Sequence, residues 1–185
     1  MIAGRDEAVI AAQLGRAPRG LLGVAHRCPC GLPDVAKTAP RLPDGSPFPT
    51  LYYLTCPRAA AAVSKLEAAG LMRDMTARLA DDALRHRYQA AHRDYVARRE
   101  TAARDAGVEP LPAGTQSAGG MPARVKCLHA LVAHELAAGE VNPFGREALD
   151  AVGAWWLAGP CVPGESGACE ENGVPEETGG PEGTP

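Results

Sequence analysis

The sequence is poor in aromatic residues and in lysine. Aromatic residues make up 4% of the 185 positions, and 3 lysines stand beside 16 arginines. The hydrophobic core must therefore be built from Ala, Leu and Val. A hydrophobic fraction of 45% and a charged fraction of 22% are ordinary for a globular protein, and the length predicts a single domain. We interpret the excess of arginine, with abundant Ala, Gly and Pro, as a composition bias of the genome rather than a binding signal.

Long apolar runs and a secretion signal are also missing. No uninterrupted run of about 18 apolar residues occurs, so we expect no membrane span. The first residues, MIAGRDEAVIAAQLGR, carry acidic groups where a signal peptide carries basic ones. We therefore expect a cytoplasmic protein. In that compartment six cysteines are expected to be thiols or metal ligands rather than disulfides.

The main part of the chain lacks a strong charge of either sign. Residues 159–185 contain six acidic residues and no basic ones, which leaves 19 basic and 16 acidic groups in residues 1–158. This mild positive charge is far from the basic surface of a general nucleic-acid binder, so we expect no specific nucleic-acid partner. The sequence predicts one globular domain over residues 1–158 and a disordered acidic tail over 159–185, rich in Pro, Gly and Glu.

Hydrophobic spacing and the Gly and Pro positions predict a mainly helical α+β fold. We expect a two- to three-stranded β element and a helical hairpin. The stretch from Pro29 to Thr50 holds six prolines, and we expect no regular structure there. The predicted strands are residues 24–28 and 51–55, and the predicted helices are residues 6–14, 57–69, 71–84, 85–106, 124–138 and 146–157.

Several long sequence strings occur together in one order. They are AAQLGRAPRG, VAHRCPCGLPDV, PRLPDGSPFPTLYYLTCP, KLEAAGLM and SAGGMPARVKCLHALVAHELAAGEVNPFG. In this order the chain resembles a bacterial, mainly actinobacterial, family catalogued as domain of unknown function 501, over about residues 6–156. The resemblance implies a cytoplasmic single-domain protein without an established activity. Its genes often lie beside those of a division-associated coiled-coil protein and of an exopolyphosphatase-type phosphatase, which is a hint about pathway and says nothing about mechanism.

The stretch VKCLHALVAH contains one cysteine and two histidines, Cys127, His129 and His134. On a helix that runs through all three, Cys127 and His134 share a face and His129 points away. Cys127 and His134 are then about 10 Å apart along the axis, too far to hold one ion without further ligands. With Cys28 and Cys56 they form a candidate zinc site. The alternative is that these cysteines are small buried hydrophobic residues, since CPCG does not have the C-x-x-C spacing of common zinc sites.

Cys127 is also a candidate catalytic nucleophile. It lies near an expected helix N-terminus, with Arg124 and Lys126 close in sequence, and both features favour the thiolate. His129, or a histidine from another segment, could act as its base. No signature of a known cysteine enzyme surrounds it.

The glycine loop SAGGMPARVK is the strongest functional candidate in the sequence. Gly119 and Gly120 allow close approach of the backbone, and a helix N-terminus with Arg124 and Lys126 suits a phosphate or another anion. Arg27 is a further candidate ligand for the anion. Neither a P-loop nor a Rossmann fingerprint is present. The alternative is an ordinary loop that precedes a helix.

Three hypotheses remain open at this point. The first is a binding or regulatory domain for a small phosphorylated or polyanionic ligand. The second is a hydrolase or transferase that depends on the Cys127 thiol or on a metal held by cysteine and histidine. The third is a scaffold or regulator linked to cell division or polyphosphate metabolism, with a division or phosphatase protein as its partner.

Overall fold

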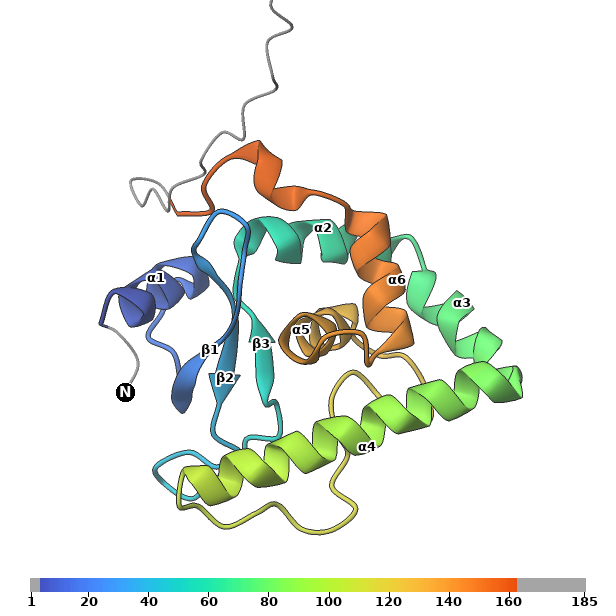
Figure 1. Ribbon diagram of the computed structural model, residues 1–185, viewed down its shortest axis with the longest axis horizontal. Helices are drawn as coiled ribbons and strands as arrows, with labels where there is room; N and C mark the ends of the chain where they lie inside the picture. The colour runs from blue at the N-terminus through green and yellow to red at the C-terminus, as the bar shows by residue number, and fades with distance from the viewer. Residues whose placement is uncertain (1–3, 163–185) are drawn as a thin grey trace, which may run out of the picture.

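The computed structural model describes residues 4–162 (Figure 1). The described residues form a mainly helical α+β fold with one three-stranded sheet, which confirms the predicted fold class. Their elements, in chain order, are α1 (Gly4–Leu14), β1 (Leu21–Arg27), β2 (Pro33–Thr38), β3 (Tyr52–Leu54), α2 (Pro57–Ala68), α3 (Leu71–Ala77), η1 (Arg78–Ala80), α4 (Asp82–Asp105), α5 (Leu128–Ala138), α6 (Pro143–Val152) and η2 (Trp155–Ala158).

Helix α5 is the centre of the molecule. Figure 1 shows it nearly end-on, with the sheet on one side and α2, α6 and α4 around the rest. Its sequence, LHALVAHELAA, is apolar on almost every face, as expected for a helix enclosed by other elements. Leu128, Leu131 and Val132 are all within 1% of complete burial. The main hydrophobic core therefore forms around α5.

The sheet is antiparallel in the order β1-β2-β3. Strand β2 lies in the proline-rich stretch, so the prediction of no regular structure there is wrong. Pro33 is the first residue of β2, a position that tolerates proline in a strand. Because β2 is the middle strand and contacts α1 as well as α5, nearly all of its residues are buried. It therefore shows no alternation of apolar and polar residues.

The last helix begins and ends earlier than predicted. The segment NPFG, just before the predicted start at residue 146, contains the N-cap of α6, because the Asn142 side chain accepts a hydrogen bond from the Gly145 N–H at 3.0 Å. Helix α6 ends at Val152, and the two tryptophans, Trp155 and Trp156, follow in the separate short helix η2.

The predicted domain boundary at residue 158 falls just before residues that pack on the domain. The Pro160 carbonyl accepts hydrogen bonds from the Arg58 guanidinium at 3.2 and 3.3 Å, and Val162 is 9% exposed. The predicted tail beyond Val162 lies outside the described residues. Within residues 4–162, no helix has the length and apolar character needed to cross a membrane.

Candidate functional site

Helix α5 starts at Leu128, so the predicted start at Arg124 is wrong. Cys127 is its N-cap, in extended backbone with φ −154° and ψ 111°, and gives no side-chain cap. The cap comes from α2 instead. The Leu128 N–H donates to the Glu67 carboxylate at 2.6 Å. A carboxylate from a distant helix therefore sits at the positive end of α5, where the helix dipole stabilises it.

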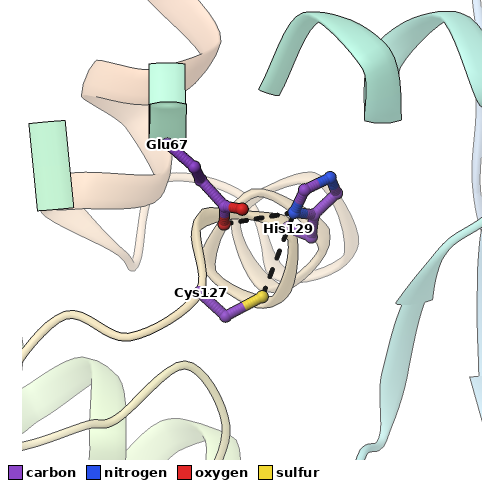
Figure 2. A group of neighbouring side chains, drawn as sticks. All are labelled: Glu67, Cys127 and His129. Atoms are coloured by element: carbon purple, nitrogen blue, oxygen red, sulfur yellow. Dashed lines mark hydrogen bonds and ion pairs between the residues drawn. The ribbon is translucent and has the colours of Figure 1, made fainter. Parts of the chain in front are cut away.

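Glu67, Cys127 and His129 converge at this point (Figure 2). His129 Nδ1 lies 3.1 Å from Glu67 Oε1 and 4.0 Å from Cys127 Sγ. One ligand atom from each residue lies within 4.8 Å of the other two, and among residues 4–162 no other three His, Cys, Asp or Glu side chains meet in this way. All three side chains are partly buried.

The opposite nitrogen of the His129 ring is turned into α2. Nε2 lies 3.0 Å from the Ala60 carbonyl and 3.2 Å from Ser64 Oγ. Since a carbonyl can only accept, Nε2 carries the proton and donates to it. This bond holds the ring with Nδ1 facing Glu67 and Cys127. Metal-binding histidines are typically oriented through their second nitrogen in this manner.

The surroundings of His129 favour its protonated form. Its hydrogen bond with Cys127, followed by the charge and hydrogen bond of Glu67 and the Ala60 carbonyl, raises the pKa of His129 to about 9, although burial opposes the shift. Near neutral pH the ring is therefore a cation held between a carboxylate and a thiol. Any metal ion that binds Nδ1 must displace this proton.

The cluster opens onto a cavity of about 330 Å³ between β3 and the start of α5. Cys127 and His129 lie in its wall, and no other charged or titratable side chain except the tyrosines lines it. The remaining lining residues are Thr50, Tyr52, Tyr53, Leu54 and Ala130. A molecule in this cavity would therefore meet the cluster through Cys127 and His129.

The candidate zinc ligands from the sequence do not come together in the structure. Cys28 packs in a separate hydrophobic cluster with Cys30, and burial raises its pKa. Cys56 is 0% exposed, and burial raises its pKa to about 11. His134 is completely buried and bonds to Asp94 Oδ2 at 2.9 Å. Among Cys28, Cys56, Cys127 and His134, only Cys127 belongs to the three-residue cluster.

The proposed anion ligands are also dispersed. Gly119 and Gly120 begin a turn, and the loop that follows is closed by the Lys126 N–H, which donates to the Gly119 carbonyl at 2.6 Å. Arg124 and Lys126 are exposed. Arg27 forms an ion pair with Asp6 at 2.6 Å. The first N–H of α5 is bound to Glu67, so this helix N-terminus already has an internal anion.

Sequence reasoning missed Glu67 and misplaced His129. The assumption of a helix from Arg124 separates Cys127 from His129, whereas extended backbone at Cys127 lets the two side chains meet. No sequence signal distinguishes Glu67 from other glutamates on helix surfaces, because the residues that it meets lie about 60 positions away.

Comparison with known proteins places most of the chain in one family. The family model described as "Protein of unknown function (DUF501)" matches residues 24–150, from β1 into α6, and includes all three residues of the cluster. Neither the curated proteins nor the solved structures contain a match to the chain.

Proposed function

The chain belongs to the DUF501 family of proteins of unknown function, and we propose that it binds a transition-metal ion of the zinc class through Glu67, Cys127 and His129. The observation that carries this proposal is the convergence of a thiol, an imidazole nitrogen and a carboxylate oxygen on one point. These are the three donor types that zinc takes from proteins.

The distances between the ligand atoms suit a tetrahedral ion. Bond lengths of about 2.0–2.3 Å around a tetrahedral centre place neighbouring ligand atoms about 3.3–3.8 Å apart. The two measured separations, 3.1 Å from His129 Nδ1 to Glu67 and 4.0 Å from Nδ1 to Cys127, lie on either side of this range. Shifts of about half an ångström would bring these two separations into the range, and the third pair, Glu67 and Cys127, lies within 4.8 Å.

Three protein ligands leave a fourth position open. Structural zinc sites normally use four protein ligands, whereas catalytic sites use three and keep one position for water or substrate. Here the cavity lined by Cys127 and His129 gives access to that position. A bound ion would lower the pKa of a water molecule there, so a metal-dependent hydrolase or transferase is the activity that this arrangement favours.

A purely thiol-dependent enzyme fits the geometry less well. In a catalytic triad the nucleophile and the acidic residue bind opposite nitrogens of the histidine, which links the three groups in series. In this cluster the thiol and the carboxylate both face Nδ1, and Nε2 is bound to a backbone carbonyl. Two groups that share one nitrogen can hold an ion with it, whereas a catalytic triad needs its nucleophile and its acid on different nitrogens of the histidine.

The test is metal binding by protein purified without a histidine tag, dialysed against chelator and reloaded with Zn²⁺ or Co²⁺. We expect one equivalent of metal per chain and, with Co²⁺, the near-ultraviolet charge-transfer band of a thiolate ligand. Cys127→Ser should remove that band, and His129→Gln should reduce the affinity at least about tenfold. Glu67→Gln should also reduce the affinity, because the amide oxygen carries no negative charge. That oxygen can still accept the hydrogen bond from the Leu128 N–H, so the start of α5 should be preserved.

Matched controls are Cys161→Ser, which changes another half-buried thiol, and His86→Gln, which changes an exposed histidine on α4. Both should bind metal like the unaltered protein. Substoichiometric metal in the unaltered protein, or equal binding by Cys127→Ser, would show that the cluster is not a metal site.

The anion site at the glycine loop and the link to cell division or polyphosphate metabolism stay predictions. The anion site has some support from the exposure of Arg124 and Lys126 next to the loop. A thermal-shift series with phosphate, nucleotides and polyphosphate at low salt tests anion binding directly. Stabilisation that is lost in the double variant Arg124→Gln, Lys126→Gln would establish it.

A further inference from the structure

A second cavity lies at the other end of α5, away from the proposed metal site. Its volume is about 460 Å³, and its walls come from β1, the end of α5, α6 and η2. Both tryptophans of the chain line it, with ring centroids 4.8 Å apart and ring planes at 84°. The other lining residues are His26, Pro29, Leu136, Arg146, Leu149, Asp150, Gly153 and Ala154.

His26 is oriented in this cavity by a buried carboxylate. Its Nδ1 lies 2.8 Å from Oδ1 of Asp34, a β2 residue that is 0% exposed. The second carboxylate oxygen, Oδ2, has no hydrogen-bond partner among residues 4–162. A buried carboxylate needs a donor, so Nδ1 carries a proton toward it. In the tautomer with its proton on Nδ1, Nε2 is the hydrogen-bond acceptor.

That acceptor has no protein partner. Within residues 4–162 nothing forms a hydrogen bond with His26 Nε2. The His26 side chain lines the cavity and is 32% exposed. A histidine whose Nδ1 is fixed by a carboxylate and whose Nε2 has no protein partner has the arrangement of an enzymatic general base. It can accept a proton or a hydrogen bond from a bound molecule.

Trp155 contributes ring surface rather than a polar group to the same wall. Its indole N–H is buried and has no hydrogen-bond partner in the described part of the chain. The buried N–H is therefore out of reach of a molecule in the cavity. The polar group that the cavity offers is the acceptor on His26, and a hydroxyl group is the simplest donor to it.

The charge of the cavity indicates a neutral ligand. Arg146 and Asp150 form an ion pair at 2.9 Å, so the arginine charge is already balanced. The rest of the wall is mostly aromatic or aliphatic. An anion would find no uncompensated cation here, whereas an aromatic ring could pack against the tryptophans.

We propose that this cavity is a second binding site, for a small neutral aromatic molecule with a hydroxyl group. The hydroxyl donates to His26 Nε2, while the ring packs against the tryptophan pair. Asp34 is a positioning residue, which sets the tautomer and the direction of His26. This site does not depend on the proposed metal site.

Intrinsic fluorescence tests the proposal directly, because both tryptophans line the cavity. The probes are phenol and toluene, which have the same ring and differ in the hydroxyl group. Excitation at the red edge of the indole band avoids absorption by either probe. We expect saturable changes in emission, with phenol bound about fivefold to tenfold more tightly than toluene, since one hydrogen-bonded group is worth about that factor.

The variant His26→Asn separates the hydrogen bond from simple packing. Its amide nitrogen can still donate to Asp34, but it places no acceptor where Nε2 stood. Phenol should then bind about as weakly as toluene, whose affinity stays unchanged. His86→Gln is the matched control and should preserve the preference for phenol.

Three results would overturn the proposal: no saturable change with phenol, equal affinities for phenol and toluene in the unaltered protein, or an intact preference for phenol in His26→Asn. Equal affinities would instead indicate a purely apolar groove, such as one that binds a side chain of another protein. The comparison of the two probes needs no variant, so it remains decisive even if His26→Asn fails to fold.

Discussion

At the scale of single residues, the glycine loop serves packing. Gly119 has φ +64°, and a Cβ atom there would lie 2.6 Å from Leu131 Cδ2 and 3.0 Å from the Cys127 carbonyl oxygen. The absence of a side chain therefore lets the loop lie directly on the first turns of α5. This close approach supports the extended backbone at Cys127, and through it the position of the thiol in the cluster.

Gly119→Ala should lower the free energy of unfolding by about 2–4 kcal/mol, because it adds a steric clash to an unfavourable backbone conformation. Gly107→Ala is the matched control, since Gly107 has the same φ of +64° with no atom within 4 Å of the added Cβ. Its loss should be about 1 kcal/mol. Urea unfolding measures both. Equal losses would mean that the contact with Leu131 contributes nothing.

At the scale of elements, α5 places two polar residues, His134 and Glu135, in the core, and each forms hydrogen bonds there. His134 Nε2 donates to Asp94 at 2.9 Å, and its Nδ1 accepts from the Asn142 amide at 3.3 Å. Glu135 accepts the Asn142 backbone N–H at 2.7 Å. The His134 ring stacks on Tyr52, with centroids 6.1 Å apart. These bonds fix α5 against α4, β3 and the start of α6.

Because of this network, the free energy of unfolding is expected to decrease at acidic pH. Burial lowers the pKa of His134 below its ordinary 6.5, although Asp94 opposes the shift. The unfolded chain therefore takes up a proton more readily than the folded one. Stability should fall as pH decreases below about 6.5, by at most about 1.4 kcal/mol per pH unit for this single group.

Thermal or urea unfolding of metal-free protein between neutral and mildly acidic pH checks this. His134→Gln should cost about 1–3 kcal/mol near neutral pH, yet show a shallower decline in acid. His92, whose pKa is also lowered mainly by burial, accounts for part of the remaining slope. His86→Gln, at an exposed position, should retain the full slope. An unchanged slope in His134→Gln would assign the pH dependence to other groups.

At the scale of the whole molecule, a small second core ties the two ends of the described chain together. Val9 of α1, the segment Cys28–Leu32 and Val162 pack against one another, with the tryptophan pair beside them. Arg58 of α2 holds the Pro160 carbonyl next to this cluster. Packed residues therefore continue through Val162, a few positions past the predicted boundary, which itself stays a prediction.

Two truncations test this boundary. A chain that ends after Ala158 loses the burial of Val162 and the hydrogen bonds to Pro160, and should be about 2 kcal/mol less stable than one that ends after Val162. Denaturant unfolding of both proteins measures the difference. If the two unfold at the same denaturant concentration, the packing of residues 159–162 contributes nothing to stability.

The sequence by itself determined the family, the fold class and the approximate position of most elements. Local signals carried these, such as Pro57 at the start of α2 and the apolar run of α5. Strand β2 was not predicted, because burial on both faces removes the alternation of apolar and polar residues that indicates a strand. The start of α5 was misjudged because its cap, Glu67, comes from another helix.

Only the tertiary structure decided which side chains share a site. It brought Glu67 to Cys127 and His129 from about 60 residues away, moved His134 into a separate buried network, and placed His26 in a wall with both tryptophans. Spacing along a chain predicts neighbours only within one element, where the backbone geometry is known. Contacts between elements depend on how their apolar faces pack around α5, and that packing is a property of the whole chain.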